Sequence, residues 1–368
     1  MALGLEQLDD FVHAFQQKYP MGKWQDISMD LQKYYFASRL FDQAKKDEMI
    51  GSQCKWKIET GYADNFQVVG LYHRDSSNRV NVLDEGELKW GMTTTNYHYD
   101  LDEDVFSQGA DAIVDYIKLR EDGMMKSFFA GMEDLMFGAG PTSSTQSPFP
   151  PVSLLWWITA TSDSTTDNNA TEGFNGAEPI GWSSTGVGGI KTSEYDNWKN
   201  RTFPYTDVTR DDFIEKVINS MDFCVFEPPI ERPDIVSQTR PNWELLTTHS
   251  RVAQGRKLLQ LGNDNIKDDL AAHSGKVYIR GVPMVNVPAW TNSQSANART
   301  DGIILGMNWS TVKWYYRKGR NQRKRRAYQH PEMSNVRIRK MDDAGQIVCF
   351  NRRANFRGYC ENTVTELT

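Results

Sequence analysis

The residues with the greatest capacity for chemistry form a run of cations towards the C-terminal end of the chain. Seven of the ten residues from 317 to 326 are basic. Cations at this density can neutralise successive phosphates, with affinity that falls steeply as salt rises. They can equally pair with carboxylates on another copy of the chain, or remain solvated, which is the usual role of a charge run. The seven are Arg317, Lys318, Arg320, Arg323, Lys324, Arg325 and Arg326.

An acidic segment between residues 84 and 104 is the counterpart of this basic run. It contains seven carboxylates and one lysine. Residues 313 to 357 carry a net charge of +11, so the rest of the chain carries −17 although the total is only −6. Separate surfaces of opposite charge favour binding to an external polyanion or to other copies of the same chain. The carboxylates are Asp84, Glu85, Glu87, Asp100, Asp102, Glu103 and Asp104.

Patterns typical of a catalytic, cofactor or metal site are missing from the sequence. The glycine-rich segment 185–192 resembles a phosphate-binding loop, but Ile190 stands where such a loop needs glycine before Lys191. His98 and Asp100 could suggest a metal, yet residues 97–100 alternate as a strand does, which favours a solvated polar face. We therefore expect no catalytic residue, no metal and no cofactor.

Aromatic residues leave two further kinds of binding open. Eleven tryptophans and many carboxylates are compatible with a sugar-processing or sugar-binding protein, although no segment singles out a pair of acids for glycoside chemistry. Trp309 and Trp314 lie near the basic run and could stack on single-stranded bases. Their pattern favours instead one face of a buried strand. Core packing is also expected for Trp156 and Trp157, which lie in an apolar, strand-like run.

Composition indicates a globular protein that stays in the cytoplasm where it is made. The chain has 368 residues, 39% of them hydrophobic, which supports a substantial core. Its best apolar run, 152–160, is half the length of a membrane span. Acidic residues at positions 6, 9 and 10 are unlike the start of a signal peptide. Four cysteines without a CxxC pair fit a reducing compartment.

The first half of the chain predicts an arm, a hairpin and a rod. Residues 1–50 have a broken helical pattern, and residues 51–100 read as two long strands with turns at 75–78 and 84–86. Apolar residues at helical spacing predict a long helix over 109–138. An isolated hairpin is only marginally stable in water, so we expect this one to lie on another surface.

The second half predicts a mixed α+β region after a loop-rich stretch at 139–205. A helix should begin behind Thr209 as its N-cap and direct Phe213, Val217 and Met221 inward. Another helix is predicted from 243 to 261. Short strands follow at 276–279, 283–288 and 302–305, with a final pair at 335–339 and 346–350.

This order of elements resembles the major capsid proteins of tailed bacteriophages, which have the Hong Kong 97-like fold. Residues 279–285 (IRGVPMV) look like the G-x-P-V turn of that family. Residues 302–306, followed by 312–314, look like the strand and short element after that turn, and 347–353 resemble the closing strand. The resemblance implies an α+β fold with N-arm 1–50, extended loop 51–105, peripheral domain 106–204 with a spine helix at 107–138 and a loop-rich insertion, axial domain 205–325, and a return to the peripheral domain at 326–368.

The resemblance also implies a function. It predicts a non-enzymatic head protein that assembles with itself into hexamers and pentamers of an icosahedral shell around double-stranded DNA, in a virion made in the bacterial host cytoplasm. The implied partners are a portal protein at one vertex, a separate scaffold or decoration protein, and packaged DNA bound without sequence preference, with no membrane. The cations at 317–326 would meet carboxylates of a neighbouring subunit or line the packaged DNA. The alternative is a nucleic-acid-binding protein or nuclease that uses the same basic run.

Overall fold

The computed structural model describes part of the chain. Side chains and backbone are described for residues 39–40, 46–61, 66–72, 83–100, 119–160, 171–225, 242–258, 277–291, 297, 299 and 302–361, and the backbone alone for 110–118 and 259–261. A unit of residues 1–33 separates from a unit of residues 34–368, and every described residue belongs to the second. Most of the predicted helical arm therefore lies outside the described residues, as do Asp102, Glu103 and Asp104.

The first sheet gathers strands from both ends of the described chain. Its order is β1-β10-β13-β11, and β4 and β12 also pair with β13. β13 is the central strand, because β10, β11 and β12 lie along one edge and β4 lies along the other. The strands are β1 (Lys46–Met49), β4 (Gly91–Asp100), β10 (Val312–Arg317), β11 (Arg323–Lys324), β12 (Tyr328–Gln329) and β13 (Val336–Cys349).

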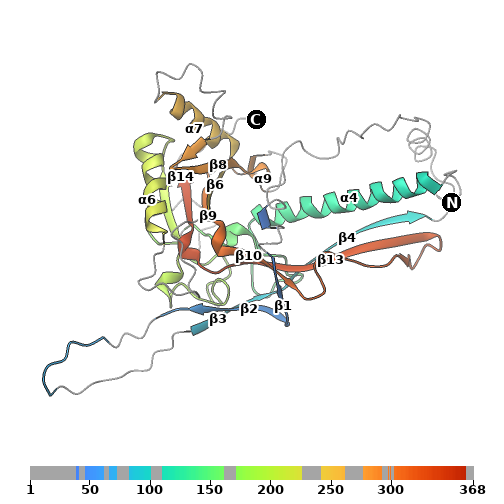
Figure 1. Cartoon of the computed structure of the whole chain (residues 1–368), viewed down its shortest axis with the longest axis horizontal. Helices are drawn as coiled ribbons and strands as arrows, with labels where there is room; N and C mark the ends of the chain where they lie inside the picture. Colours follow the sequence, from blue (N-terminus) through green and yellow to red (C-terminus); the bar gives the residue numbers. More distant parts are fainter. Residues whose placement is uncertain are drawn as a thin grey trace. The chain divides into compact units, whose positions relative to one another are not determined.

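Helix α4 (Ala110–Phe137) packs on this sheet through β4, and it runs alongside β4 and β13 (Figure 1). The predicted long helix is therefore confirmed. Met124, Phe128 and Met132 are buried, and their spacing of four residues places them on one face of the helix. Tyr97 on β4 and Met341 on β13 are buried in the same core. None of the helices within the described residues is long and apolar enough to cross a membrane.

The second sheet has the order β5-β14-β9-β6-β8-β7. Its core contains the buried Phe213, Val217 and Met221, as predicted, and the Thr209 side chain accepts a hydrogen bond from the backbone N–H of Asp212 as the helix cap. The strands are β5 (Arg201–Tyr205), β6 (Trp243–Thr247), β7 (Val277–Ile279), β8 (Val282–Asn286), β9 (Ile304–Asn308) and β14 (Phe356–Cys360). The accompanying helices are η4 (Arg210–Ile214), α6 (Glu215–Phe223), α7 (His249–Leu261) and α9 (Pro288–Thr291).

The predicted hairpin is formed by β2 (Gln53–Glu59) and β3 (Leu83–Lys89), which pair with each other alone among the described strands. The turn predicted at 84–86 is wrong. Asp84, Glu85 and Gly86 are in β3, directly opposite residues 56–58, because they continue the alternation of exposed and buried side chains. The second predicted strand is divided at Trp90, beyond which the chain enters β4 and the first sheet.

Other predictions failed where short patterns were ambiguous. Residues 243–247 form β6, and the helix predicted from 243 begins only at His249. The strands predicted at 335–339 and 346–350 are one continuous strand, β13. Trp156 and Trp157 are buried as predicted, but in a short helix, α5 (Leu154–Trp157), rather than a strand. Three 3₁₀ helices complete the described elements: η3 (Asp196–Trp198), η5 (Trp309–Thr311) and η6 (Arg352–Ala354).

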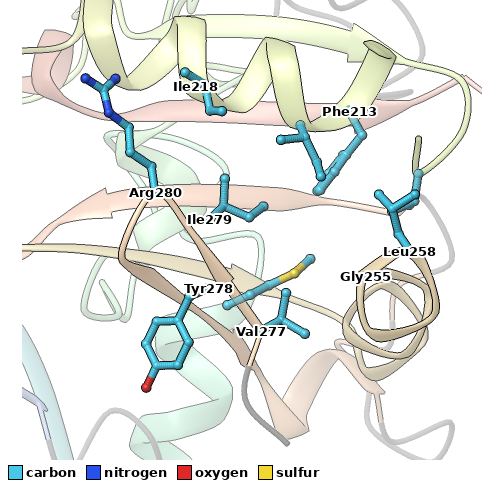
Figure 2. Close-up of a pocket in the computed structure, with 11 residues that line it drawn as sticks. Phe213, Ile218, Gly255, Leu258, Val277, Tyr278, Ile279 and Arg280 are labelled. Atoms are coloured by element: carbon cyan, nitrogen blue, oxygen red, sulfur yellow. The ribbon is translucent and has the colours of Figure 1, made fainter. Parts of the chain in front are cut away.

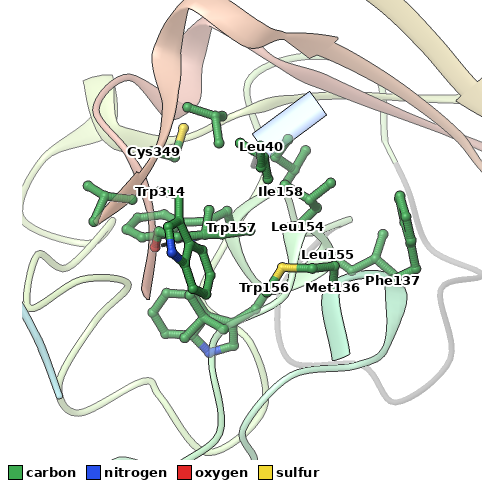
Figure 3. Packing of buried hydrophobic residues seen from close by; sticks show 14 of the residues in the cluster. Leu40, Met136, Phe137, Leu154, Leu155, Trp156, Trp157, Ile158, Trp314 and Cys349 are labelled. Atoms are coloured by element: carbon green, nitrogen blue, oxygen red, sulfur yellow. Dashed lines mark hydrogen bonds between the residues drawn. The ribbon is translucent and has the colours of Figure 1, made fainter. Parts of the chain in front are cut away.

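Tryptophans pack edge to face in the core beneath the hairpin. Trp156 contacts Trp157 at 5.1 Å and Trp182 at 4.9 Å between ring centroids, and Trp157 also contacts Trp56 of β2 at 5.9 Å. Edge-to-face pairs contribute about 0.5–1.5 kcal/mol each beyond their burial. Figure 3 shows Trp314 of β10 packed beside Trp156 and Trp157. The predicted burial of Trp314 and Trp309 is confirmed.

The fully buried guanidinium of Arg352 links the loop-rich segment 139–205 to this core. Arg352 donates to the carbonyl oxygen of Trp157 at 2.6 Å, to that of Ala177 at 3.1 Å and to Asn200 Oδ1 at 3.2 Å. It also reaches Thr159 Oγ1 at 3.2 Å. Burial lowers the pKa of Arg352 to about 10, so the group remains protonated at neutral pH. One buried cation therefore satisfies backbone acceptors from separate parts of the loop-rich segment.

We predict that Arg352→Met lowers the free energy of unfolding by about 3 kcal/mol, because the buried acceptors lose their donor. Arg352→Lys should rescue only part of this, since an ammonium cannot reproduce the planar fork. Urea unfolding of the unassembled chain provides the measurement. Arg353→Met, at the adjacent and more exposed position, is the control and should cost less than about 1 kcal/mol. Equal losses in both variants would contradict the role given to Arg352.

The turn that follows β10 is held by a buried carboxylate. Asp343 on β13 is 2% exposed and accepts a hydrogen bond from the backbone N–H of Gln322 at 3.0 Å. Gln322 has a positive φ of 45°, so this contact fixes an uncommon backbone conformation. Desolvation raises the pKa of Asp343 to about 6. Since the folded pKa lies above the ordinary value of 3.8, stability falls as pH rises from about 4 to about 6, and the full cost of ionised Asp343 is present above about pH 6.

We predict that Asp343→Asn stabilises the fold at about pH 8, by about 2 kcal/mol, because the amide keeps an acceptor and removes the buried charge. The gain should shrink as pH falls from about 6 towards 4, where the wild-type side chain becomes protonated. Urea unfolding of both proteins across this range provides the test. A variant that is less stable than wild type at pH 8 would contradict the assignment.

Candidate interaction surfaces

The glycine-rich segment 185–192 packs against the hairpin. The backbone N–H of Glu87 donates to the carbonyl oxygen of Gly188 at 2.8 Å. Gly188 has φ +67°, and a Cβ there would lie 3.0 Å from Trp56 and 3.2 Å from Trp157. Turns rather than a helix follow these glycines. The glycines thus allow close approach of the hairpin base to its own subunit, and the geometry is not that of a phosphate-binding loop.

The basic run folds back along β13. It begins at the end of β10, turns at Gly319, and returns through β11, where Arg323 lies opposite Asp342 and Lys324 lies opposite Met341. Because residues directly opposite in a sheet point to the same side, and neighbours in a strand to opposite sides, Arg323 and Lys324 belong to different faces.

One face of the sheet directs its charges to α4. Lys324 and Arg339 both pair with Glu121 on that helix, Arg339 at 3.5 Å. The hydrogen bond from Lys324, followed by the charges of Lys324 and Arg339, holds the pKa of Glu121 below its ordinary value despite partial burial. These charges fasten the helix to the sheet.

The opposite face gathers cations around Asp342. Arg325 pairs with this carboxylate, Arg323 lies 3.5 Å from it and Lys340 lies 3.7 Å from it. Burial alone would raise the pKa of Asp342, but the hydrogen bond and charge of Arg325, the charge of Lys340 and the hydrogen bond from Arg323 hold it below the ordinary value. The single carboxylate of Asp342 is therefore shared by three cations.

The rest of the basic run is differently placed. Arg320 contacts the sulfur of Met92 on β4 at 4.0 Å. Arg317, Lys318 and Arg326 have no carboxylate partner within the described part of the chain. The seven predicted residues thus fall into three groups. Lys324 pairs with α4, and Arg323 and Arg325 lie around Asp342. The remaining four have no acidic partner among the described residues.

The acidic residues of the hairpin lie in a different sheet from the basic run. Glu85 and Glu87 on β3 lie 3.5 Å and 3.4 Å from Lys55 on β2, so part of their charge is neutralised within the hairpin. Asp84 is half-buried beside them. Asp100 lies at the end of β4, opposite Val336, in the sheet that carries the basic run. Within one subunit the structure does not bring 84–87 against 317–326.

Several residues that are important to these surfaces were not predicted from the sequence. Lys340, Asp342 and Glu121 lie at the centre of the charge groups, yet only the strand pairing and the helix position reveal this. The sequence did contain one signal of these charge groups, which is the acidic pair Asp342 and Asp343 inside a basic strand.

The hairpin also presents a run of exposed apolar side chains. Phe66 is 89% exposed, Val68 89% and Leu71 95%. Val69 and Tyr72 in the same segment are exposed as well. A contiguous apolar run on a loop is typical of a surface that another molecule covers.

Reactive groups outside these surfaces are buried or solvated. All four cysteines are free and buried, and desolvation raises the pKa of Cys54 to about 12 and of Cys349 to about 11, which disfavours the nucleophilic thiolate. His98 is exposed on the polar side of β4, as predicted. No cluster of metal-ligating side chains is found among the described residues.

A cavity of about 180 Å³ lies between α6, α7 and the β7–β8 hairpin (Figure 2). Its walls are almost entirely apolar and include Phe213, Ile279 and Met284. Arg280 lies at its edge and is paired with Asp222. Apart from Tyr278 and Arg280, its lining residues carry no group suited to acid–base or nucleophilic chemistry.

The architecture is similar to that of solved capsid structures. No family model matches the chain, and no curated protein matches it. A solved structure of the cyanophage A-1(L) capsid asymmetric unit is similar with a TM-score of 0.60 and 11% sequence identity, covering 95% of this chain and 98% of that chain. The capsid of a native GTA particle is similar with a TM-score of 0.52 and 7% identity, covering 95% and 99%.

The long helix against a sheet, the projecting hairpin and the second sheet with its flanking helices occur here in the predicted order. Both similar structures cover nearly the whole chain, so the likeness extends to the complete arrangement rather than to one domain. The chain has the α+β fold of the tailed-phage major capsid proteins, the Hong Kong 97-like fold.

Proposed function

We propose that this chain is a major capsid protein, a non-enzymatic subunit that assembles with copies of itself into a shell enclosing double-stranded DNA. The fold supports the proposal. The observation that carries it is the exposed apolar segment 66–72 on a hairpin that pairs with no other described strand.

The energetics of this hairpin favour a covering neighbour. Its base is anchored to its own subunit through Trp56 and Gly188, whereas Phe66, Val68 and Leu71 are almost fully exposed. Burying each such side chain contributes about 1.5–3 kcal/mol. A surface that covers all of them would therefore supply much of the free energy of one subunit contact.

Head-to-tail contact between copies gives the proposed assembly its form. A hairpin that docks on a different patch of the next subunit makes a heterologous interface, which closes into rings when the rotation permits. We propose hexamers and pentamers as these rings, in the virion, after synthesis in the host cytoplasm. A portal protein at one vertex and a separate scaffold or decoration protein are the proposed further partners.

The proposed domains follow the sheets. We assign β2 and β3 to the extended loop, α4 with the first sheet to the peripheral domain, and the second sheet with α6 and α7 to the axial domain. The boundaries at residues 50, 105, 204 and 325 stay predictions, and they differ from this assignment by sheet, in which β4, β10 and β11 belong to the first sheet and β5 and β14 to the second. Asp84, Glu85 and Glu87 remain candidate contacts to cations of a neighbour.

We predict that Phe66→Ser combined with Leu71→Ser blocks assembly and leaves the subunit folded. The changed side chains contribute almost nothing to the core, because they are 89% and 95% exposed. Sedimentation velocity should show shells or capsomers for wild type and unassembled subunits for the variant, with matching circular dichroism.

The matched control keeps the apolar surface at the same positions. Phe66→Leu with Leu71→Met should assemble as wild type does. Normal assembly of the serine variant would remove the support that the apolar segment gives to the proposal.

A further inference from the structure

One face of the first sheet is exposed to solvent along β4, from Met92 to His98. On β4 the alternate residues Met92, Thr94, Asn96 and His98 are exposed, whereas Tyr97 is buried towards the core that contains α4. These four lie directly opposite residues 344, 342, 340 and 338 of β13, so they mark the same face of that strand. The open face is defined by β4, β13 and β11 on the side away from α4.

Cations from two strands converge on this open face. Arg323 and Arg325 project to it from the returning chain beside β13, and Lys340 projects to it from β13 itself. Their side chains are 43%, 47% and 33% exposed, whereas Asp342 beneath them is only 11% exposed. The carboxylate is therefore covered, and the positive groups form the accessible layer.

Among the described residues, positive charge on this face exceeds negative charge. Three cations share Asp342, which leaves an excess of two positive charges, and Arg320 adds another beside Met92. Asp100 lies further along β4, opposite Val336. On the other face, by contrast, Lys324 and Arg339 pair with Glu121 on α4.

We propose that the open face binds the phosphate backbone of double-stranded DNA through Arg320, Arg323, Arg325 and Lys340. This inference deepens the proposed function, since it identifies the surface that would meet enclosed DNA. It also separates the basic run into residues that bind DNA and a residue, Lys324, that holds α4.

Spacing and orientation favour a polyanion over a single carboxylate. Side chains two residues apart on a strand are about 6.7 Å apart, and adjacent strands are about 4.8 Å apart, so these cations recur in two directions across an open surface. A duplex presents one phosphate per about 3.4 Å along each strand. A row of phosphates can engage the cations in turn, and both arginines are held beside Asp342.

The test compares two double variants of the full-length, unassembled chain that remove the same charge from opposite faces. Arg323→Gln with Arg325→Gln empties the open face, and Lys324→Gln with Arg339→Gln empties the α4 face. Binding of fluorescent double-stranded DNA of arbitrary sequence is measured across a range of salt. For the open-face variant, the slope of log affinity against log salt should be smaller by about 1.8.

The α4-face variant should bind DNA as wild type does, once circular dichroism shows that it is folded. Arg323→Lys with Arg325→Lys should retain the wild-type slope, because each lysine still neutralises one phosphate. Equal loss in the two glutamine variants would overturn the proposal and leave net charge as the explanation. If the open-face variant failed to assemble into shells but kept its affinity for DNA, the proposal would be overturned. The open face would then be a contact between subunits. Wild-type DNA binding without shells would contradict the proposed function alone.

Discussion

The fold depends on one buried guanidinium at the crossing between its two sheets. Arg352 lies in η6, between β13 of the first sheet and β14 of the second. It donates to Trp157 and Ala177 carbonyl oxygens and to Asn200 Oδ1, all in the segment that contains little regular structure. Backbone acceptors buried without a donor would destabilise that segment, so a planar, multivalent donor is needed at this place. One of these contacts is to the backbone of Trp157, whose ring packs against Trp156 and Trp56 beneath the hairpin.

Charge is used for two different purposes on the two faces of the first sheet. Towards α4, Lys324 and Arg339 converge on Glu121, and the result is a fastening between helix and sheet. Away from α4, Asp342 is outnumbered by cations and is itself covered, so positive charge remains available to a partner. Alternation along a strand is enough to produce this division, because successive residues point to opposite faces.

The sequence was most informative where a signal is local. The helix α4, the Thr209 cap with the inward Phe213, and the solvated His98 all follow from periodicity or capping within a few residues. Strand pairing is not local: β13 joins β4 from some 240 residues earlier, so neither the continuity of β13 nor the central position of Asp342 could be predicted from neighbouring residues. Short patterns such as 243–247 failed because a few apolar residues suit a strand and a helix equally well.

We propose that this chain builds a closed shell from copies of itself, with the hairpin as an essential contact. Negative-stain electron microscopy of the purified wild-type protein, at high concentration and low salt, tests that claim most directly. We expect closed shells, or rings of five and six subunits that precede them. Particles that remain single subunits under every such condition would contradict it.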